Sequence, residues 1–243
     1  MEETKAAPQA MGSPEEAYRE VLSRLASSSA KKVLDAPAGR GALSRLLLDH
    51  GYEVEASDIL PDLFEVAGVE CRASNLNDRL PYENASFDAV ASCNGLHRVY
   101  AVGRAISEYA RVLRPGGLLL VTLPNFTKLT RRLRFLFTGV VSWAAVRSGR
   151  ESDEPEAHFR NTVGLPQILL AMKEAGLEFR GMRSIEKHRG RIFYLPAALC
   201  IRLGLLFVPH RRRAEHSLIE TASFPALFGD FLFLEAEKPR GGR

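Results

Sequence analysis

The chain has 243 residues, of which 46% are hydrophobic and 26% are charged, and its formal net charge is +4. A chain of this length and composition can bury a substantial core, which argues against a disordered or fibrous protein. The three cysteines, Cys71, Cys93 and Cys200, are far apart in the sequence, so we expect neither a disulfide framework nor a thiolate metal site.

The first segment of the chain, residues 1–12, is polar and rich in alanine. Because it lacks the apolar core of a signal peptide, we expect a disordered tail on a cytoplasmic protein. Ser13, Pro14 and Glu16 then predict the start of a helix, with a serine cap, a proline in the first turn and a capping box. A single domain is therefore expected over residues 13–243.

Residues 33–41, Val-Leu-Asp-Ala-Pro-Ala-Gly-Arg-Gly, predict a buried strand that runs into a glycine-bearing loop. Gly39 and Gly41 allow the backbone to approach a ligand closely, and residues 42–48 have the apolar spacing of a helix. This arrangement is where α/β proteins hold a nucleotide. A second alternating run ends at Asp58, where an acidic side chain can accept both hydroxyls of a ribose.

The spacing within this loop separates two nucleotide-binding folds. A dinucleotide fingerprint would place glycines at positions 37, 39 and 42, and only position 39 holds one. A ladder at positions 37, 39 and 41 matches twice, with Asp35 just ahead. The stretch resembles the first motif of class I S-adenosylmethionine-dependent methyltransferases, with Pro37 in place of the first glycine. Proline fits such a loop only where φ is negative and no amide donor is needed.

The resemblance continues through a third strand at 69–73, a polar loop at 75–82 and a fourth strand at 86–93. It implies a Rossmann-like, doubly wound sheet of seven mostly parallel strands, the last one antiparallel. A helical run from Leu96 to Leu113 and a fifth strand at 118–121 follow, and we expect Gly116 and Gly117 to end that helix. The sixth and seventh strands are expected at 176–186 and 231–237, with a helix at 166–175 before them.

The resemblance also implies a site for S-adenosylmethionine across the ends of strands one, two and four. Asp35, Ala38, Gly39 and Gly41 would hold the methionine end, and Asp58 the ribose. Asn75 stands where the family carries an acidic residue, and its amide oxygen would accept from the adenine amine beside Leu76. The other positions expected to line the cofactor are Pro37, Ile59, Cys93 and Asn94.

Two insertions depart from a minimal nucleotide fold, at about 126–160 and 188–229. Residues 126–150 carry a charge of +6, and residues 183–213 carry +7. Both stretches are apolar between their charges, yet neither has the roughly twenty uninterrupted apolar residues of a membrane span. Helices packed on the core fit this pattern, and so does a cover for an amphipathic or lipid-linked acceptor that rests on an anionic membrane.

The partner expected from these features is a small molecule, and no nucleic-acid module is apparent. Methyl transfer is an in-line displacement that gains rate chiefly from alignment and the exclusion of water. An oxygen acceptor would also need a base, for which His97 after the fourth strand and His158 in the first insertion are the candidates. A helix cap or a surface position explains each histidine equally well, and no metal site is expected.

Two other functions stay open at this point. A non-catalytic module could keep this fold to bind a partner, and it would fold without binding the cofactor. A nicotinamide-dependent oxidoreductase is opposed by the loop spacing and would be detected by NAD titration. The sequence does not identify the acceptor, the atom that receives the methyl group, or the oligomeric state.

Overall fold

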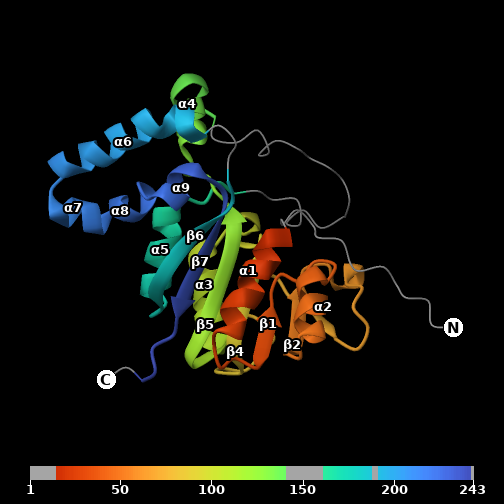
Figure 1. The fold of residues 1–243 in the computed structure, drawn as a ribbon. Coiled ribbons are helices and arrows are strands. Elements are labelled where there is room, and N and C mark those ends of the chain that lie inside the picture. Colours follow the sequence, from red (N-terminus) through yellow and green to blue (C-terminus); the bar gives the residue numbers. More distant parts are fainter. Residues whose placement is uncertain (1–14, 141–160, 188–190, 242–243) are drawn as a thin grey trace.

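The computed structural model describes residues 15–140, 161–187 and 191–241, and Figure 1 shows its fold. Seven strands form one sheet in the order β3-β2-β1-β4-β5-β7-β6. They are β1 (Lys32–Asp35), β2 (Glu53–Asp58), β3 (Cys71–Ala73), β4 (Phe87–Cys93), β5 (Leu113–Pro124), β6 (Glu178–Lys187) and β7 (Gly229–Glu237). The pairs among the first five strands are parallel, and β7 is antiparallel to both neighbours. The expected doubly wound sheet with an antiparallel last strand is confirmed.

Helices cover both faces of this sheet (Figure 1). α1 (Glu15–Ala26) and α2 (Ala42–Asp49) pack on one face, and α3 (Val102–Val112) and α5 (Leu165–Glu174) pack on the other. Successive side chains of a strand point to opposite faces of the sheet. Val33 therefore lies in the hydrophobic cluster with α1 and α2, and Leu34 lies in the cluster with α3 and α5. β1 is therefore apolar on both sides, as a central parallel strand has to be.

Most of the expected helix and strand ends lie within two or three residues of the observed ends. The helix expected at 166–175 is α5, and the sixth and seventh strands each begin about two residues from the expected position. The expected helical run after β4 is divided. A 3₁₀ turn, η2 (Leu96–Arg98), comes first, and α3 begins only at Val102.

The expectation that Gly116 and Gly117 end a helix was wrong. α3 ends at Val112, and β5 already begins at Leu113. The pairing of β4 with β5 is displaced between Phe87 and Ala89, so Arg114–Gly117 form an irregular stretch of β5. Gly116 has φ +81°, and its amide donates to Lys238 O at 2.7 Å. The two glycines allow the irregular backbone of β5 where it meets β4 and the residue after β7. In the sequence, a glycine pair of this kind looks the same as one that ends a helix.

Helices from both insertions stand together beyond the end of β5 (Figure 1). They are α4 (Leu129–Thr138), η5 (Arg191–Tyr194), α6 (Leu195–Gly204), η6 (Leu205–Phe207), α7 (His210–Glu215), α8 (Leu218–Thr221) and α9 (Phe224–Phe228). Leu129 of α4, Ala198 of α6 and Leu227 of α9 share one hydrophobic cluster. Within the described ranges, no helix is both long and apolar enough to span a bilayer. The expected tail at 1–12, and Ser13 and Pro14, lie outside those ranges.

The ring of Pro37 fills the space that a side chain at Gly95 would need. A Cβ at Gly95 would lie 2.3 Å from Pro37 Cδ and 3.0 Å from Ser92 Oγ. Proline in the loop after β1 and glycine after β4 are therefore complementary, and they bring two loops at the same sheet edge into close contact.

Gly95→Ala should lower the free energy of unfolding by about 1–3 kcal/mol, because a methyl group is forced into a filled space. Urea denaturation measures the change. Gly103→Ala is the matched control, since a Cβ at Gly103 in α3 meets nothing within 4 Å; it should leave stability unchanged or slightly increased. Equal effects of the two substitutions would contradict this account.

Candidate functional site

The carboxyl ends of the parallel strands meet at one edge of the sheet, which is the edge where open α/β sheets bind ligands. The chain leaves β1 toward β2 on one side, whereas β4 pairs with the other side of β1. The loop at 36–41 therefore stands at the point where the strand order reverses. The loops that follow β2, β3 and β4 begin at the same edge.

The glycine-bearing loop adopts a conformation that only its glycines accommodate easily. Gly39 has φ +54° and Gly41 has φ +88°, both in the left-handed region. A Cβ at Gly41 would also lie 2.5 Å from Val66 Cγ2. The peptide bond before Pro37 is cis. Pro37 stands where the family has its first glycine, and it has no amide hydrogen to donate.

Asp58, at the end of β2, holds this loop through its carboxylate. Oδ2 accepts from the Gly39 amide at 2.8 Å, and Oδ1 accepts from the Leu60 amide at 3.0 Å. A carboxylate has about four acceptor positions, so two amides leave room for two further donors. Asp58 and Ile59 are half-buried. The carboxylate expected to bind a ribose is thus preorganised by the loop itself.

Asp35, the last residue of β1, is almost completely buried. Its side chain accepts from Ser44 Oγ of α2 at 2.7 Å, and the residue is 1% exposed. Burial raises the pKa of this carboxyl to about 7, and the negative charge of Asp58 adds to the rise, while the Ser44 hydrogen bond opposes it. Near neutral pH, Asp35 is therefore poised between its neutral and charged forms.

Tyr109 supports the loop from the other face of the sheet. Its hydroxyl lies 2.9 Å from Ala36 O, to which it donates, and 2.9 Å from Ser92 Oγ. The side chain is fully buried, and burial raises the pKa of the phenol above its ordinary value. The sequence did not identify Tyr109 as a site residue, because it falls on the apolar stripe of a helix and is typical of a core position there.

Asn75 follows β3, as expected, but its amide oxygen is already engaged. Oδ1 accepts from both the backbone amide and the side-chain amide of Asn77, at 2.9 and 3.0 Å. Asn77 in turn accepts from the amides of Tyr100 and Ala101. Two donors thus already engage this oxygen, which has two lone pairs, and the acceptor role expected of Asn75 toward the adenine stays a prediction. Leu76 is buried beside it.

The end of β4 contributes three of the expected residues. Cys93 and Asn94 are buried, and Asn94 has φ +60°, a conformation that asparagine tolerates better than most residues. Burial raises the pKa of the Cys93 thiol to about 12, so it is a neutral lining group. His97 is 6% exposed, and its ring lies 6.4 Å from that of Phe126 after β5. His158 lies outside the described residues.

Arg131 of α4 brings a cation to the same region. Its guanidinium lies 4.7 Å from the centre of the Phe126 ring, and its buried Nη1 has no hydrogen-bond partner among the described residues. Desolvation lowers the pKa of Arg131. Sequence reasoning noticed the charge of the insertion but not which arginine turns inward. The spacing of the arginines in this insertion does not indicate that Arg131 is the one that turns inward.

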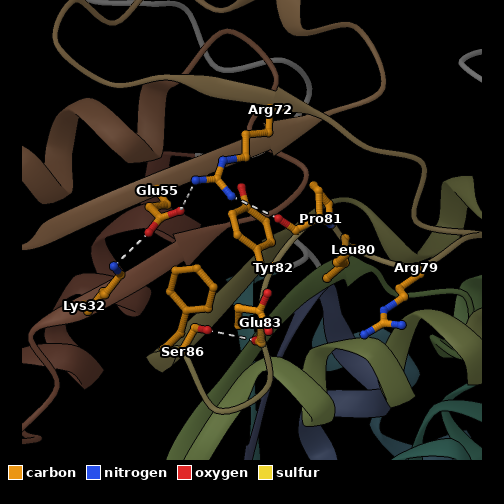
Figure 2. A pocket seen from close by; sticks show the side chains of 10 residues that line it. Lys32, Glu55, Arg72, Arg79, Leu80, Pro81, Tyr82, Glu83 and Ser86 are labelled. Carbon is orange, nitrogen blue, oxygen red and sulfur yellow. Dashed lines mark hydrogen bonds and ion pairs between the residues drawn. The ribbon is translucent and has the colours of Figure 1, made fainter.

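A cavity of about 530 Å³ lies at the opposite edge of the sheet, where β1 and β4 begin. Figure 2 shows Lys32 and Arg72 both pointing toward Glu55, with which they form ion pairs of 2.8 and 3.5 Å. Tyr82 beside them donates to Ala56 O. The principal charged groups of this cavity bond one another, and none of the residues expected at the cofactor site lines it.

The polar groups at the carboxyl edge fit S-adenosylmethionine, which has cationic sulfonium and ammonium groups and a ribose with two hydroxyls. Two carboxylates, Asp35 and Asp58, flank a loop whose glycines admit close approach. No group of His, Cys, Asp or Glu that could hold a metal ion occurs in the described parts of the chain.

Comparisons with known proteins agree with this arrangement. The family described as "Methyltransferase domain" matches residues 34–121. A ubiquinone biosynthesis O-methyltransferase of Xylella fastidiosa is 34% identical over 115 residues, which are 44% of this chain and 47% of that protein. A demethylmenaquinone methyltransferase of Beutenbergia cavernae is 37% identical over 114 residues, 42% of this chain and 45% of that protein. The chain thus aligns with about half the length of these curated relatives.

Among solved structures, a putative methyltransferase from Bacillus halodurans superposes with a TM-score of 0.60 at 16% identity. The match covers 91% of this chain and 98% of that one, so the similarity in fold extends well past the region of sequence similarity.

Asp35→Asn should abolish one component of the pH dependence of stability. The unfolded carboxyl titrates near its ordinary value of 3.8, and the folded one near 7. Between these values the folded state binds a proton that the unfolded state lacks, so the free energy of unfolding falls as the pH rises from about 4 to about 7. At pH 8, the variant should be more stable than the parent by about 1–3 kcal/mol.

Urea denaturation at several pH values between 4 and 8 measures this difference. Ser44→Ala is a useful companion, because it removes the hydrogen bond to Asp35 and keeps the carboxyl. A constant stability difference between the parent and Asp35→Asn across this range would contradict the raised pKa.

Proposed function

Because residues 34–121 match the methyltransferase domain family and the chain forms a doubly wound sheet of seven strands, we propose that this protein is an S-adenosylmethionine-dependent methyltransferase. The observation that carries the proposal is the carboxylate of Asp58, fixed by the Gly39 amide at the end of β2. It combines the ribose acceptor and the glycine loop of a nucleoside site in one contact.

Each part of the cofactor has candidate residues at the carboxyl edge. Asp35, Pro37, Ala38, Gly39 and Gly41 would hold the methionine end, and Asp58 with Ile59 the ribose. Leu76 would pack against the adenine, and Asn75 would donate from its amide nitrogen, since its oxygen is engaged by Asn77. Cys93 and Asn94 complete the lining from the end of β4.

The cationic groups of the cofactor would also give the buried carboxylate of Asp35 an opposite charge. A nearby positive charge favours the ionised carboxyl and lowers its pKa. Binding at neutral pH would therefore release a proton from Asp35, and affinity would rise as the pH rises through about 7.

For the acceptor, we propose an aromatic compound with a lipid tail, as in the quinone pathways for which the two relatives are named. Phe126 offers a ring, and the buried Nη1 of Arg131 offers a donor for an oxygen atom. The apolar helices of the insertions stand beyond the same edge of the sheet. The enzyme would act by holding the acceptor atom in line with the methyl carbon and the sulfur while excluding water.

His97 is the candidate base for a hydroxyl acceptor. It would take the proton that the hydroxyl loses as its oxygen bonds to the methyl carbon and the carbon–sulfur bond breaks. His158 is the alternative. Both assignments require an oxygen acceptor, since a carbon or nitrogen acceptor places the proton differently.

Calorimetry tests cofactor binding with S-adenosylhomocysteine. Asp58→Ala should weaken binding by about 1–3 kcal/mol, because charged hydrogen bonds to the ribose are lost. Asp62→Ala removes an exposed carboxylate four residues away and should have little effect. A folded parent protein that binds neither this compound nor S-adenosylmethionine would favour the non-catalytic module, and binding of NAD alone would favour the oxidoreductase.

His97→Gln should lower kcat on a phenolic quinone precursor by about 10²–10⁴-fold if His97 is the base, with little change in cofactor affinity. The matched substitution His158→Gln separates the two histidines. Unchanged rates in both variants would show that no histidine base is used.

A further inference from the structure

Helix α6 has two apolar faces, and only one of them is covered. Ala198 is buried, with Tyr194 and Ile201 packed beside it against α4 and α9. A second stripe points to solvent and is formed by Leu195, Leu199, Leu203 and Leu206. Their spacings of four, four and three residues place these leucines on one side of a helical path.

Exposed aromatic residues extend this apolar surface. Phe207 of η6 is 89% exposed, Phe193 of η5 is 83% exposed, and Phe137 at the end of α4 is 81% exposed. Leu136 beside Phe137 is exposed as well. Several large exposed apolar side chains on neighbouring elements mark a binding site more often than scattered single residues do.

Basic charges predominate among the apolar residues. Residues 126–140 and 191–215, which include all of α7, contain nine Lys or Arg and one acidic residue, Glu215, whose carboxylate lies 2.7 Å from Arg211 Nε. Arg202 lies on α6 itself, and Arg211 and Arg212 are exposed on α7. Arg202 also contacts the ring of Phe224 at 5.1 Å, which fixes a cation beside the apolar stripe.

We propose that this surface, formed by α4, η5, α6, η6 and α7 and called here the docking surface, binds an anionic lipid bilayer. Leucine and phenylalanine side chains would enter the boundary of the acyl chains, and the arginines would contact lipid phosphates. An apolar stripe bordered by arginine is the pattern of a helix that lies in a membrane interface. The positive charge of this surface disfavours dimerisation through it, because the arginines of the two copies would be brought together and would repel each other.

The position of the docking surface gives it a role in the reaction, and this step alone rests on the proposed function. β5 leads directly into α4, and α9 leads into β7 where it pairs with the end of β5. The docking surface therefore lies beyond the carboxyl end of β5 (Figure 1). Asp58 ends β2 and His97 follows β4, so both belong to the carboxyl edge of the same parallel sheet. A lipid-linked acceptor could reach that edge with its tail still in the bilayer.

Vesicle sedimentation tests the proposal with the full chain and without cofactor or acceptor. Binding is expected to vesicles that contain phosphatidylglycerol, weaker binding to pure phosphatidylcholine, and a decline with added salt. Leu203→Glu combined with Phe207→Glu should reduce the partition coefficient at least tenfold. Both side chains are exposed, so the fold should not depend on them.

Leu170→Glu is the matched control, because Leu170 is a leucine of α5 that is 55% exposed and belongs to no part of the docking surface. It should leave vesicle binding unchanged. Arg211→Glu combined with Arg212→Glu should weaken binding to anionic vesicles about fivefold or more and leave binding to neutral vesicles nearly unchanged.

A fluorescent label on Cys200, which is exposed on α6, reports insertion directly in a Cys71→Ser background. A blue shift with anionic vesicles supports the proposal. No binding, equal binding of the Leu203/Phe207 variant, or concentration-dependent dimers that this variant abolishes would overturn it. Because vesicle binding is measured without the cofactor, it can fail while calorimetry succeeds, and the reverse.

Discussion

The site depends on holding one short backbone segment open over the edge of the sheet. Three contacts from two separate elements, α3 and β2, position the loop at 36–41. Tyr109 of α3 donates to Ala36 O, Ser57 O of β2 accepts from the Ala38 amide, and Asp58 accepts from the Gly39 amide. Since none of these contacts is local in sequence, the loop acquires its shape only when β1, β2 and α3 have all packed. A ligand would therefore meet a preorganised cradle rather than have to build one.

The same preorganisation places an ionisable group where water cannot reach it. Asp35 gains one hydrogen bond from Ser44 and loses its hydration, so its carboxyl titrates near pH 7 instead of near its ordinary value of 3.8. A hydrophobic residue at this position would avoid the cost of burying a carboxyl. A cationic ligand beside Asp35 would stabilise the charged form, and such an exchange of stability for function is common at binding sites.

Much of the sheet and of the cofactor loop could be predicted from the sequence, because buried strands, glycine spacing and a terminal aspartate are local patterns. What could not be predicted depends on contacts between distant segments. The bulge at Arg114–Gly117 arises where β5 meets both β4 and the residues after β7. The engagement of Asn75 by Asn77, and the ring of Pro37 against Gly95, likewise join loops whose approach leaves no periodic signal.

Charge is distributed unevenly along the chain, and this bears on how the molecule would orient at a charged surface. The basic stretches at 126–140 and 191–214 carry nine positive charges with no acidic residue, while the whole chain carries only +4. The remaining residues therefore sum to −5. An anionic surface attracts the first group and repels the second, so long-range forces would turn the molecule before any side chain makes contact. With α4 and α6 foremost, the proposed docking surface would contact the bilayer, and the carboxyl edge of the sheet would be turned toward it. An acceptor with a lipid tail would then reach the enzyme by diffusing within the membrane.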